Sequence, residues 1–308
     1  RQRQMCIRDR ARLDLAQLVA EGDRLAFSPD SYVIDPLFFP GGNIGKLAIC
    51  GTANDVAVSG AIPRYLSCGF ILEEGLQMET LKAVVTSMAE TARAAGIAIV
   101  TGDTKVVQRG AADKLFINTA GMGAIPANIH WGAQTLTAGD VLLVSGTLGD
   151  HGATILNLRE QLGLDGELVS DCAVLTPLIQ TLRDIPGVKA LRDATRGGVN
   201  AVVHEFAAAC GCGIEISEAA LPVKPAVRGV CELLGLDALN FANEGKLVIA
   251  VERNAAEQVL AALHSHPLGK DAALIGEVVE RKGVRLAGLY GVKRTLDLPH
   301  AEPLPRIC

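Results

Sequence analysis

The sequence predicts a protein of two domains in which strands alternate with helices. Its 308 residues exceed a typical domain of about 150 residues. Apolar residues make up 49% of the chain and aromatic residues only 4%, a composition that suits closely packed layers of helices and sheets. Both halves repeat a similar alternation, and the composition shifts near residues 127–137. We therefore expect one domain over residues 25–130 and a second over residues 131–300.

Apolar periodicity locates the elements of the first half. The expected strands cover residues 25–28, 64–72, 97–100 and 115–121, and the expected helices cover residues 47–59 and 78–95. A turn rich in glycine precedes the first helix, and Gly96 stops the second. The strand over residues 97–100 is uniformly apolar, which predicts that it is buried.

The second half is read in the same way. Its expected strands cover residues 140–146, 247–251 and 273–279, and its expected helices cover residues 172–182, 199–210 and 255–264. A further helix is expected to open at the glycine-flanked segment 149–152.

Charge and cysteine usage exclude several classes of protein. The net charge is -5 with mixed signs, and without a cluster of Lys and Arg a nucleic-acid or anionic membrane partner is not expected. No apolar run approaches the roughly 20 residues that span a bilayer, and no secretory signal is present, which predicts a cytoplasmic protein. The eight cysteines are scattered, which predicts reduced thiols, and the pair Cys210 and Cys212 lacks further zinc ligands at suitable spacing.

Three aspartates in the first half are candidate metal ligands. Asp30 and Asp103 follow strand segments, and Asp55 lies in a glycine-flanked helix. If they converge, their oxygens suit Mg²⁺, which bridges to phosphate oxygens. The alternative is three ordinary turn or cap aspartates.

A lysine and a glycine turn are candidate phosphate ligands. Lys105, two residues after Asp103, offers a point charge. The turn that contains Gly41, Gly42 and Gly45 precedes a helix and offers backbone N–H groups to an anion. A glycine turn without this role is the alternative.

Glu244 is the candidate base of the second half. It stands between Asn243 and Gly245 just before an apolar strand, and burial there raises a carboxyl pKa toward the range useful for proton transfer. A turn or capping glutamate is the alternative. The cluster of Arg192, Asp193 and Arg196 is either functional or a salt-bridged helix start.

The segment 303–308, PLPRIC, is expected to be an extended, mobile arm. Two prolines exclude a helix or a central strand. The thiol of Cys308 is then mobile. Cys308 is either an incidental surface cysteine on a frayed end or a thiol that carries a group into an active site.

Seven motifs resemble those of the HypE family of hydrogenase maturation proteins, which are carbamoyl dehydratases of the aminoimidazole ribonucleotide synthetase (PurM)-like superfamily. They are DSYVIDPLFFPGGNIGKLAICGTANDVAVSGAIP (30–63), VTGDTKVVQRG (100–110), FINTAGMG (116–123), VSGTLGDHG (144–152), RDATRGG (192–198), ANEGKL (242–247) and PRIC (305–308). The resemblance implies an α+β fold of two domains, each a mixed sheet covered by helices, with a flexible tail over residues 301–308.

The resemblance also implies a reaction. A carbamoyl group delivered by HypF would be held on the thiol of Cys308 as an S-carboxamide, dehydrated with ATP to a thiocyanate, and passed as cyanide to the HypC–HypD complex for a [NiFe] hydrogenase. The implied cofactors are ATP and Mg²⁺, and the implied assembly is a homodimer. The family pattern assigns residues of this chain as follows: Cys308, Glu244 and Lys105 are catalytic; Asp30, Asp55 and Asp103 bind metal; Gly45, Asn54, Asp55, Thr101, Asp103 and Thr104 bind the nucleotide.

Residues 1–24 depart from the family, which has a glycine-rich segment near its start that closes over the nucleotide. We expect them to be foreign to the protein or the remnant of a truncation. The alternative functions are another ATP-using activity of the superfamily, such as selenophosphate synthetase or thiamine-monophosphate kinase, or a scaffold that docks partners through its terminal thiol. The other enzymes of the superfamily have no need of the PRIC ending.

Overall fold

The computed structural model describes residues 10–13, 15–164, 166, 168–299 and 305–308. The chain divides into two compact units. The first contains the residues up to Ile129 together with Cys172–Thr176 and Arg306–Cys308, and the second contains His130–Asp171 and Pro177–Pro305. Two short pieces from late in the sequence therefore belong to the first unit, an assignment that the sequence pattern did not predict.

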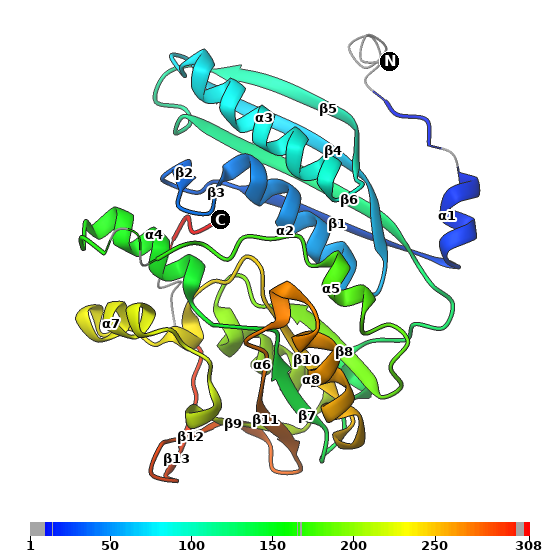
Figure 1. Cartoon of the computed structure of the whole chain (residues 1–308). Helices are drawn as coiled ribbons and strands as arrows, with labels where there is room; N and C mark the ends of the chain where they lie inside the picture. Colours follow the sequence, from blue (N-terminus) through cyan, green and yellow to red (C-terminus); the bar gives the residue numbers. More distant parts are fainter. Residues whose placement is uncertain (1–9, 14, 165, 167, 300–304) are drawn as a thin grey trace. The chain divides into compact units, whose positions relative to one another are not determined.

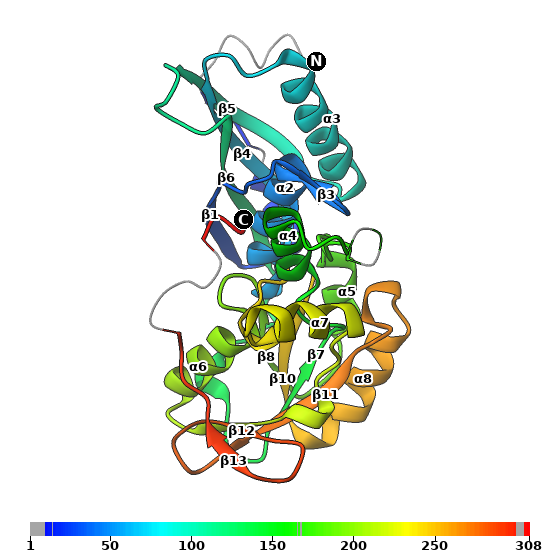
Figure 2. The same ribbon diagram turned by 90° about the vertical axis from the view of Figure 1, so that its left-hand side faces the viewer.

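The first unit is built on a sheet of four strands in the order β1-β6-β4-β5. These strands are β1 (Arg24–Tyr32), β4 (Ile62–Glu73), β5 (Ala98–Val107) and β6 (Leu115–Ile125). The pair β4 and β5 is parallel, whereas β6 is antiparallel to both of its neighbours. Figures 1 and 2 show α2 (Ile44–Val58) and α3 (Met78–Ala94) lying along this sheet. The remaining elements are α1 (Leu15–Glu21), β2 (Phe38–Phe39) and β3 (Gly42–Asn43).

Helix α2 begins three residues before the expected Leu47 because Asn43 caps it. The Asn43 side chain accepts hydrogen bonds from the backbone N–H groups of Gly45 at 2.9 Å and Lys46 at 3.1 Å. Gly45 also allows α2 to approach α3 closely, since a Cβ at that position would lie 2.4 Å from the carbonyl oxygen of Val84. Twelve of the residues of α2 are buried, so the helix forms the centre of this unit.

Strand β1 presents two different faces because its side chains alternate. Tyr32 and Ser28 point toward α2, where the Tyr32 hydroxyl lies 3.0 Å from that of Thr52. Leu25 and Phe27, at the intervening positions, are 56% and 65% exposed. One face of the sheet is therefore packed on helices, and the other displays large apolar side chains at β1.

The second unit is built on a sheet of seven strands in the order β13-β12-β9-β11-β7-β10-β8. Its strands are β7 (Val141–Val144), β8 (Val188–Asp193), β9 (Gly213–Ser217), β10 (Leu247–Val251), β11 (Ala273–Val279), β12 (Gly283–Ala287) and β13 (Lys293–Thr295). Its helices are α4 (Asp150–Glu160), α5 (Thr176–Gln180, which starts in the first unit), α6 (Gly198–Cys210), α7 (Pro225–Leu234) and α8 (Ala256–His264). Figure 2 shows α6 and α8 on opposite sides of the sheet.

The core of the second unit lies between its sheet and α6. Leu142 and Val144 from β7 meet Val203 and Phe206 from α6 in one buried cluster. Only the pair of β9 and β12 is parallel in this sheet. Both units thus combine a mixed sheet with helices, which confirms the α+β fold class.

Two sequence expectations about these elements are wrong. The strand expected at residues 97–100 to be buried is the edge strand β5, which runs on to Val107 because it pairs with β4 along its whole length. The helix expected over residues 172–182 is formed only over Thr176–Gln180, because Asn54 binds the backbone of Ala173 and Leu175 outside the helix.

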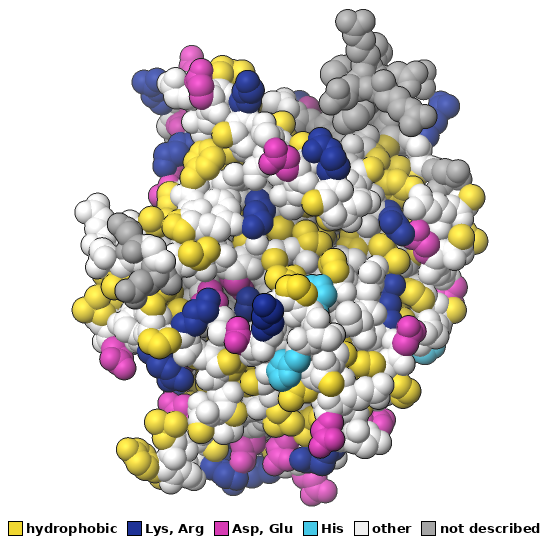
Figure 3. Space-filling view, viewed as in Figure 1, with side chains coloured by type: hydrophobic (Ala, Val, Ile, Leu, Met, Phe, Trp, Pro, Cys, Tyr) yellow, Lys and Arg dark blue, Asp and Glu magenta, His cyan; other side chains and the backbone are white. Residues whose placement is uncertain are grey.

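The surface carries mixed charges. On the face in Figure 3, Lys and Arg side chains are interspersed with Asp and Glu, without a continuous basic area. Among the described residues, no helix has the length and apolar character needed to cross a membrane, and no disulfide joins two cysteines.

Candidate functional site

Two of the three predicted metal ligands lie on the helix-covered face of the first sheet. Asp55 on α2 accepts a hydrogen bond from the hydroxyl of Ser28 on β1, with 3.1 Å between Oγ and Oδ2. Asp30 is two positions further along β1 and so points to the same face as Ser28. Asp30 Oδ1 accepts the backbone N–H of Ser31 at 2.7 Å. These two carboxylates supply hard oxygen donors of the kind that Mg²⁺ binds.

Asp103 lies apart from this pair, which corrects the expectation that the three acids converge. Along the ladders Asp103 is opposite Gly69, Gly69 is opposite Asn118, and Asn118 is opposite Ser31. Residues opposite one another share a face, so Asp103 points to the face opposite Asp30. With β6 and β4 between them, β1 and β5 are about 14 Å apart. The described residues of this chain accordingly hold no cluster of three metal-binding side chains.

Lys105 and Asp103 form an exposed ion pair on β5. The Lys105 ammonium lies 2.8 Å from Asp103 Oδ2, and both side chains are about 70% exposed (71% and 69%). The hydrogen bond from Lys105, with help from the Thr104 backbone N–H, lowers the pKa of Asp103. Thr101 and Thr104, the other expected nucleotide ligands of this strand, lie on either side of Asp103. All four expected residues are thus grouped on one edge strand.

Gly45 and Asn54 have structural roles in this chain that the sequence did not reveal. The N–H of Gly45 is bonded to Asn43 and the residue is buried against α3, so it does not offer a donor to an anion. Asn54 is 2% exposed. Its amide donates to the carbonyl of Ala173 at 3.0 Å, and its Oδ1 accepts from the N–H of Leu175 at 2.8 Å. Both residues thus contribute to the packing of the first unit, and their assignment to nucleotide binding stays a prediction.

Cys308 is docked on the first unit, whereas the sequence suggested a thiol on an extended arm. The carbonyl of Cys308 accepts the N–H of Val33 at 2.9 Å, and the guanidinium of Arg306 donates to the carbonyl of Val33 at 2.9 Å. Arg306 also pairs with Asp113 at 2.7 Å and lies over the ring of Phe116. Cys308 is 8% exposed in this position. Residues 301–304 of the expected tail lie outside the described residues.

Replacing Asp113 with asparagine is expected to release this docked segment. The Arg306–Asp113 pair is partly exposed (38% and 39%), and such a pair contributes up to about 1 kcal/mol. Its loss should raise the accessible fraction of Cys308, and thus its rate of iodoacetamide labelling, by up to about fivefold. The labelling rate is measured by mass spectrometry on the C-terminal peptide that cleavage before Asp297 releases. The control is Glu277→Gln, which breaks the exposed Arg253–Glu277 pair of the second unit. Equal labelling rates in both variants would contradict the role of Asp113.

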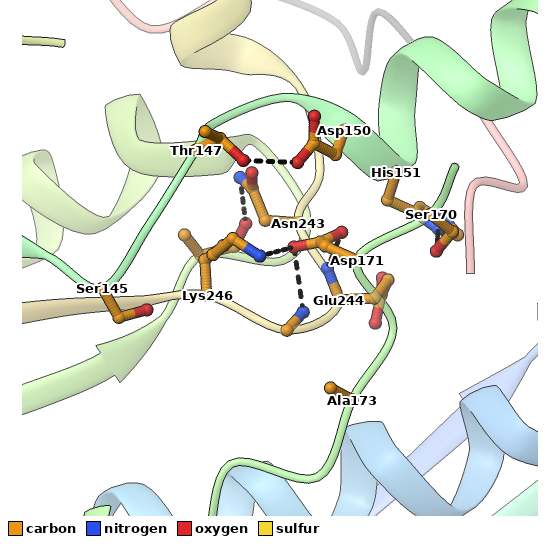
Figure 4. Close-up of polar contacts among 12 residues, drawn as sticks. Ser145, Thr147, Asp150, His151, Ser170, Asp171, Ala173, Asn243, Glu244 and Lys246 are labelled. Atoms are coloured by element: carbon orange, nitrogen blue, oxygen red, sulfur yellow. Dashed lines mark hydrogen bonds and ion pairs between the residues drawn. The ribbon is translucent and has the colours of Figure 1, made fainter. Parts of the chain in front are cut away.

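Glu244, the predicted base, lies in the second unit within the segment 241–247, which we call the Glu244 loop. Glu244 is 2% exposed. The loop connects a short helical turn at Ala238–Asn240 to β10. Figure 4 shows it among polar side chains from several parts of the unit. Glu244 thus remains the predicted base, held within a buried polar loop.

A buried aspartate that the sequence did not single out holds the Glu244 loop. Asp171 accepts the N–H of Glu244 at 3.1 Å and the N–H of Gly245 at 3.2 Å, and it lies 3.4 Å from the ammonium of Lys246 (Figure 4). No sequence signal identified it, because Asp171 is 73 positions from Glu244 and no motif contains both.

Other polar pairs surround this loop. Asp150 binds the hydroxyl of Thr147 at 2.6 Å and the ammonium of Lys224 at 2.9 Å. His151 is buried, with 2.8 Å between its Nδ1 and the hydroxyl of Ser170. These contacts fix the start of α4 and are drawn in part in Figure 4.

Ion pairs surround Arg192, as the structural alternative for this cluster expects. Arg192 pairs with Asp193 at 2.8 Å and with Glu205 of α6 at 3.4 Å. These bonds join the end of β8 to the middle of α6, and a functional role of the cluster stays a prediction.

Comparison with known proteins identifies the family. Residues 9–125 match the model of the AIR synthase related protein N-terminal domain, and residues 137–288 match that of its C-terminal domain. The chain is 98% identical over 300 residues to carbamoyl dehydratase HypE of Escherichia coli (strain K12), covering 97% of this chain and 89% of that protein. It is 50% identical over 303 residues to carbamoyl dehydratase HypE of Rhodobacter capsulatus, with coverage of 97% and 89%.

The chain belongs to the HypE family of carbamoyl dehydratases.

Solved HypE structures have the same fold. A crystal structure of E. coli HypE, described as a hydrogenase maturation protein, matches with a TM-score of 0.97 at 96% identity, covering 99% of this chain and 94% of that one. A HypE in complex with ATP matches with a TM-score of 0.93 at 46% identity, with coverage of 98% and 91%. The HypE of a HypE–HypF complex matches with a TM-score of 0.87 at 47% identity, with coverage of 89% and 90%. Membership of the HypE family confirms the resemblance expected from the seven motifs.

Proposed function

We propose that this chain uses ATP to dehydrate an S-carboxamide held on Cys308. The γ-phosphoryl group is transferred to the carboxamide oxygen, two N–H protons are removed, and the carbon–oxygen bond breaks. The products are a thiocyanate on Cys308, ADP and phosphate, so the carboxamide oxygen leaves with the phosphate. Phosphorylation is needed because an amide oxygen is a poor leaving group. The thiocyanate then supplies the cyanide ligand of a [NiFe] hydrogenase.

The position of Cys308 carries this proposal. Its backbone is bonded to Val33, three residues after Asp30, which is a distance of about 10 Å along extended backbone. The predicted carrier thiol and a predicted metal ligand therefore belong to the same edge of the first unit. The use of ATP is supported by the solved complex of a related HypE with ATP.

Each predicted site residue has its own proposed role. Asp30 and Asp55 would hold Mg²⁺, which neutralises charge on phosphate oxygens when it is bound. Lys105 pairs with Asp103 on the face of the sheet opposite Asp30, so within one chain it does not reach a phosphate held by Asp30 and Asp55, and its catalytic role stays a prediction. Glu244 accepts a proton from the carboxamide nitrogen, for which a desolvated carboxylate is suited.

The mass of the peptide that begins at Asp297 tests the proposal. Incubation with HypF, carbamoyl phosphate and ATP should first add about 43 Da to Cys308 and then remove about 18 Da, as expected for a carbamoyl intermediate and its dehydration. A peptide that gains the first mass and never loses the second would exclude the dehydration. A peptide that never changes mass would favour the scaffold function.

We also propose partners and an assembly. A cytoplasmic HypF would load Cys308, in line with the HypE–HypF complex of a relative, and a HypC–HypD complex would accept the cyanide. A second copy of the chain would cover the apolar face of the first sheet, where Leu25 and Phe27 are exposed.

The variant Phe27→Asp is expected to separate the homodimer. A charge buried at a twofold interface would weaken association by about 3 kcal/mol or more, at least 100-fold in the dissociation constant. Size-exclusion chromatography with light scattering should report a monomer. Leu233→Asp, at a leucine that is equally exposed (65%) in the second unit, serves as the control and should remain a dimer. If both variants remain dimers, Phe27 does not lie in the dimer interface.

A further inference from the structure

We propose that Asp171 is a positioning residue for Glu244, and that the rate of dehydration depends on it through the Glu244 loop. This inference depends on the proposed role of Glu244 as the base. The side chain of Asp171 is buried (2% exposed), and its contacts are directed at the loop and not at solvent.

The carboxylate of Asp171 binds three consecutive residues of the loop. One oxygen accepts the N–H of Glu244 at 3.1 Å, and the other accepts the N–H of Gly245 at 3.2 Å. The ammonium of Lys246 lies 3.4 Å from the second oxygen and neutralises the buried charge. Because the backbone at Glu244 is held at its own N–H group, the direction in which its side chain leaves the loop is held as well.

The rest of the loop is fixed independently of Asp171. The side chain of Asn243 accepts the N–H of Gly149 at 2.7 Å and donates to the carbonyl of Ala194 at 2.9 Å. At the other end, Leu247 donates to the hydroxyl of Ser145 at 2.9 Å. The two ends are therefore anchored by other groups, and the N–H groups between them, at residues 244 and 245, are bonded to Asp171.

The side chain of Lys246 is also held in position beside Asp171. The stem of Lys246 passes Gly146 so closely that a Cβ at Gly146 would lie 3.0 Å from Lys246 Cε. The ammonium is thereby directed toward the carboxylate of Asp171. Two buried backbone N–H groups and a buried cation each require an acceptor. The carboxylate of Asp171 is the acceptor for all three.

The variant Asp171→Asn has nearly the same shape but the wrong hydrogen-bonding pattern. Its amide offers one acceptor and one donor, so an N–H group of the side chain must face either a backbone N–H or Lys246. The Glu244 backbone should then shift. A misplaced catalytic group, or the loss of a group that orients one, typically costs about 10- to 100-fold in rate. We expect kcat for dehydration of the carbamoylated full-length protein to fall by that factor, with KM for ATP changed less than about twofold.

A matched control separates positioning from general destabilisation. Asp140 is another aspartate of the second unit with a buried side chain, 6% exposed. It accepts the N–H of Thr137 at 2.7 Å and pairs with Lys189 at 2.9 Å. Asp140→Asn should lower the melting temperature about as much as Asp171→Asn while leaving kcat within about twofold. If Asp171→Asn does not fold, Lys246→Met, which keeps the stem and removes the cation, is measured in its place and should also lower kcat.

The decisive measurement is a double-mutant cycle with Glu244→Gln. If Asp171 acts through Glu244, then Asp171→Asn should lower kcat in the wild-type background and add less than about twofold in the Glu244→Gln background. Full additivity of the two effects, or equal kcat values for Asp171→Asn and Asp140→Asn, overturns the positioning role. An unchanged kcat in Glu244→Gln alone would instead overturn the proposed base, so the two failures are distinguishable.

Discussion

Replacing Glu244 with glutamine is expected to lower the rate of thiocyanate formation by about 10² to 10⁴-fold, the usual contribution of a positioned general base. Glutamine keeps the size of the side chain and its place in the buried loop, but its amide does not accept the proton that must leave the carboxamide nitrogen. Loading of Cys308 with the carbamoyl group precedes this step and should be unaffected. The carbamoylated protein should therefore accumulate, visible as a peptide heavier by about 43 Da.

Glu257→Gln provides the control for this substitution. Glu257 is exposed in the first turn of α8, within the same unit, and its replacement removes the same charge without touching the Glu244 loop. It should turn over at the wild-type rate. A Glu244→Gln protein that dehydrates the carboxamide as fast as Glu257→Gln would remove Glu244 from the mechanism.

The second large effect is expected for Cys308→Ala, which should form no carbamoylated or thiocyanate product. Phosphate release in the presence of HypF, carbamoyl phosphate and ATP should fall to the level seen without HypF, because the acceptor oxygen of the phosphoryl group is absent. Phosphate release and peptide mass measured on one sample test both statements. Phosphate release that depends on HypF and continues unchanged in Cys308→Ala would refute the carrier role.

Cys231→Ala is the matched control for the carrier thiol. Burial raises the pKa of Cys231 to about 11, so its thiol stays protonated near neutral pH and is a poor nucleophile. This variant should retain both mass changes on Cys308. A loss of product in Cys231→Ala would show that removal of a thiol elsewhere is sufficient to stop the reaction.

The elements of the fold were predictable wherever the local pattern decided them. The expected strands at residues 247–251 and 273–279 agree with β10 and β11, because their apolar runs are bounded by turns. Helix α3 ends within one residue of the expected position, next to Gly96. The expected helix at residue 172 failed because its first residues are bonded to Asn54, more than a hundred positions earlier. No local pattern contains that information.

The candidate site was predictable by residue type and less so by geometry. Motifs identified Asp30, Asp55 and Asp103, but which face of the sheet each acid occupies depends on strand order and pleat. The ladder through Gly69 and Asn118 separates Asp103 from Asp30, and nothing in the spacing of the acids indicated that β1 and β5 are opposite edges. Asp171 was not predicted, for the same reason. Its contacts are with backbone N–H groups, which leave no pattern in the sequence.

Two segments from late in the sequence complete the first unit, and this affects how the protein folds during synthesis. Val33 and Asn54 are synthesised early, yet their partners are Cys308 and the segment 173–175. While the ribosome is still translating the second unit, the first one lacks contacts that complete it, although domains usually fold in order from the N-terminus. The first unit therefore reaches its final form only after residues 306–308 have left the exit tunnel.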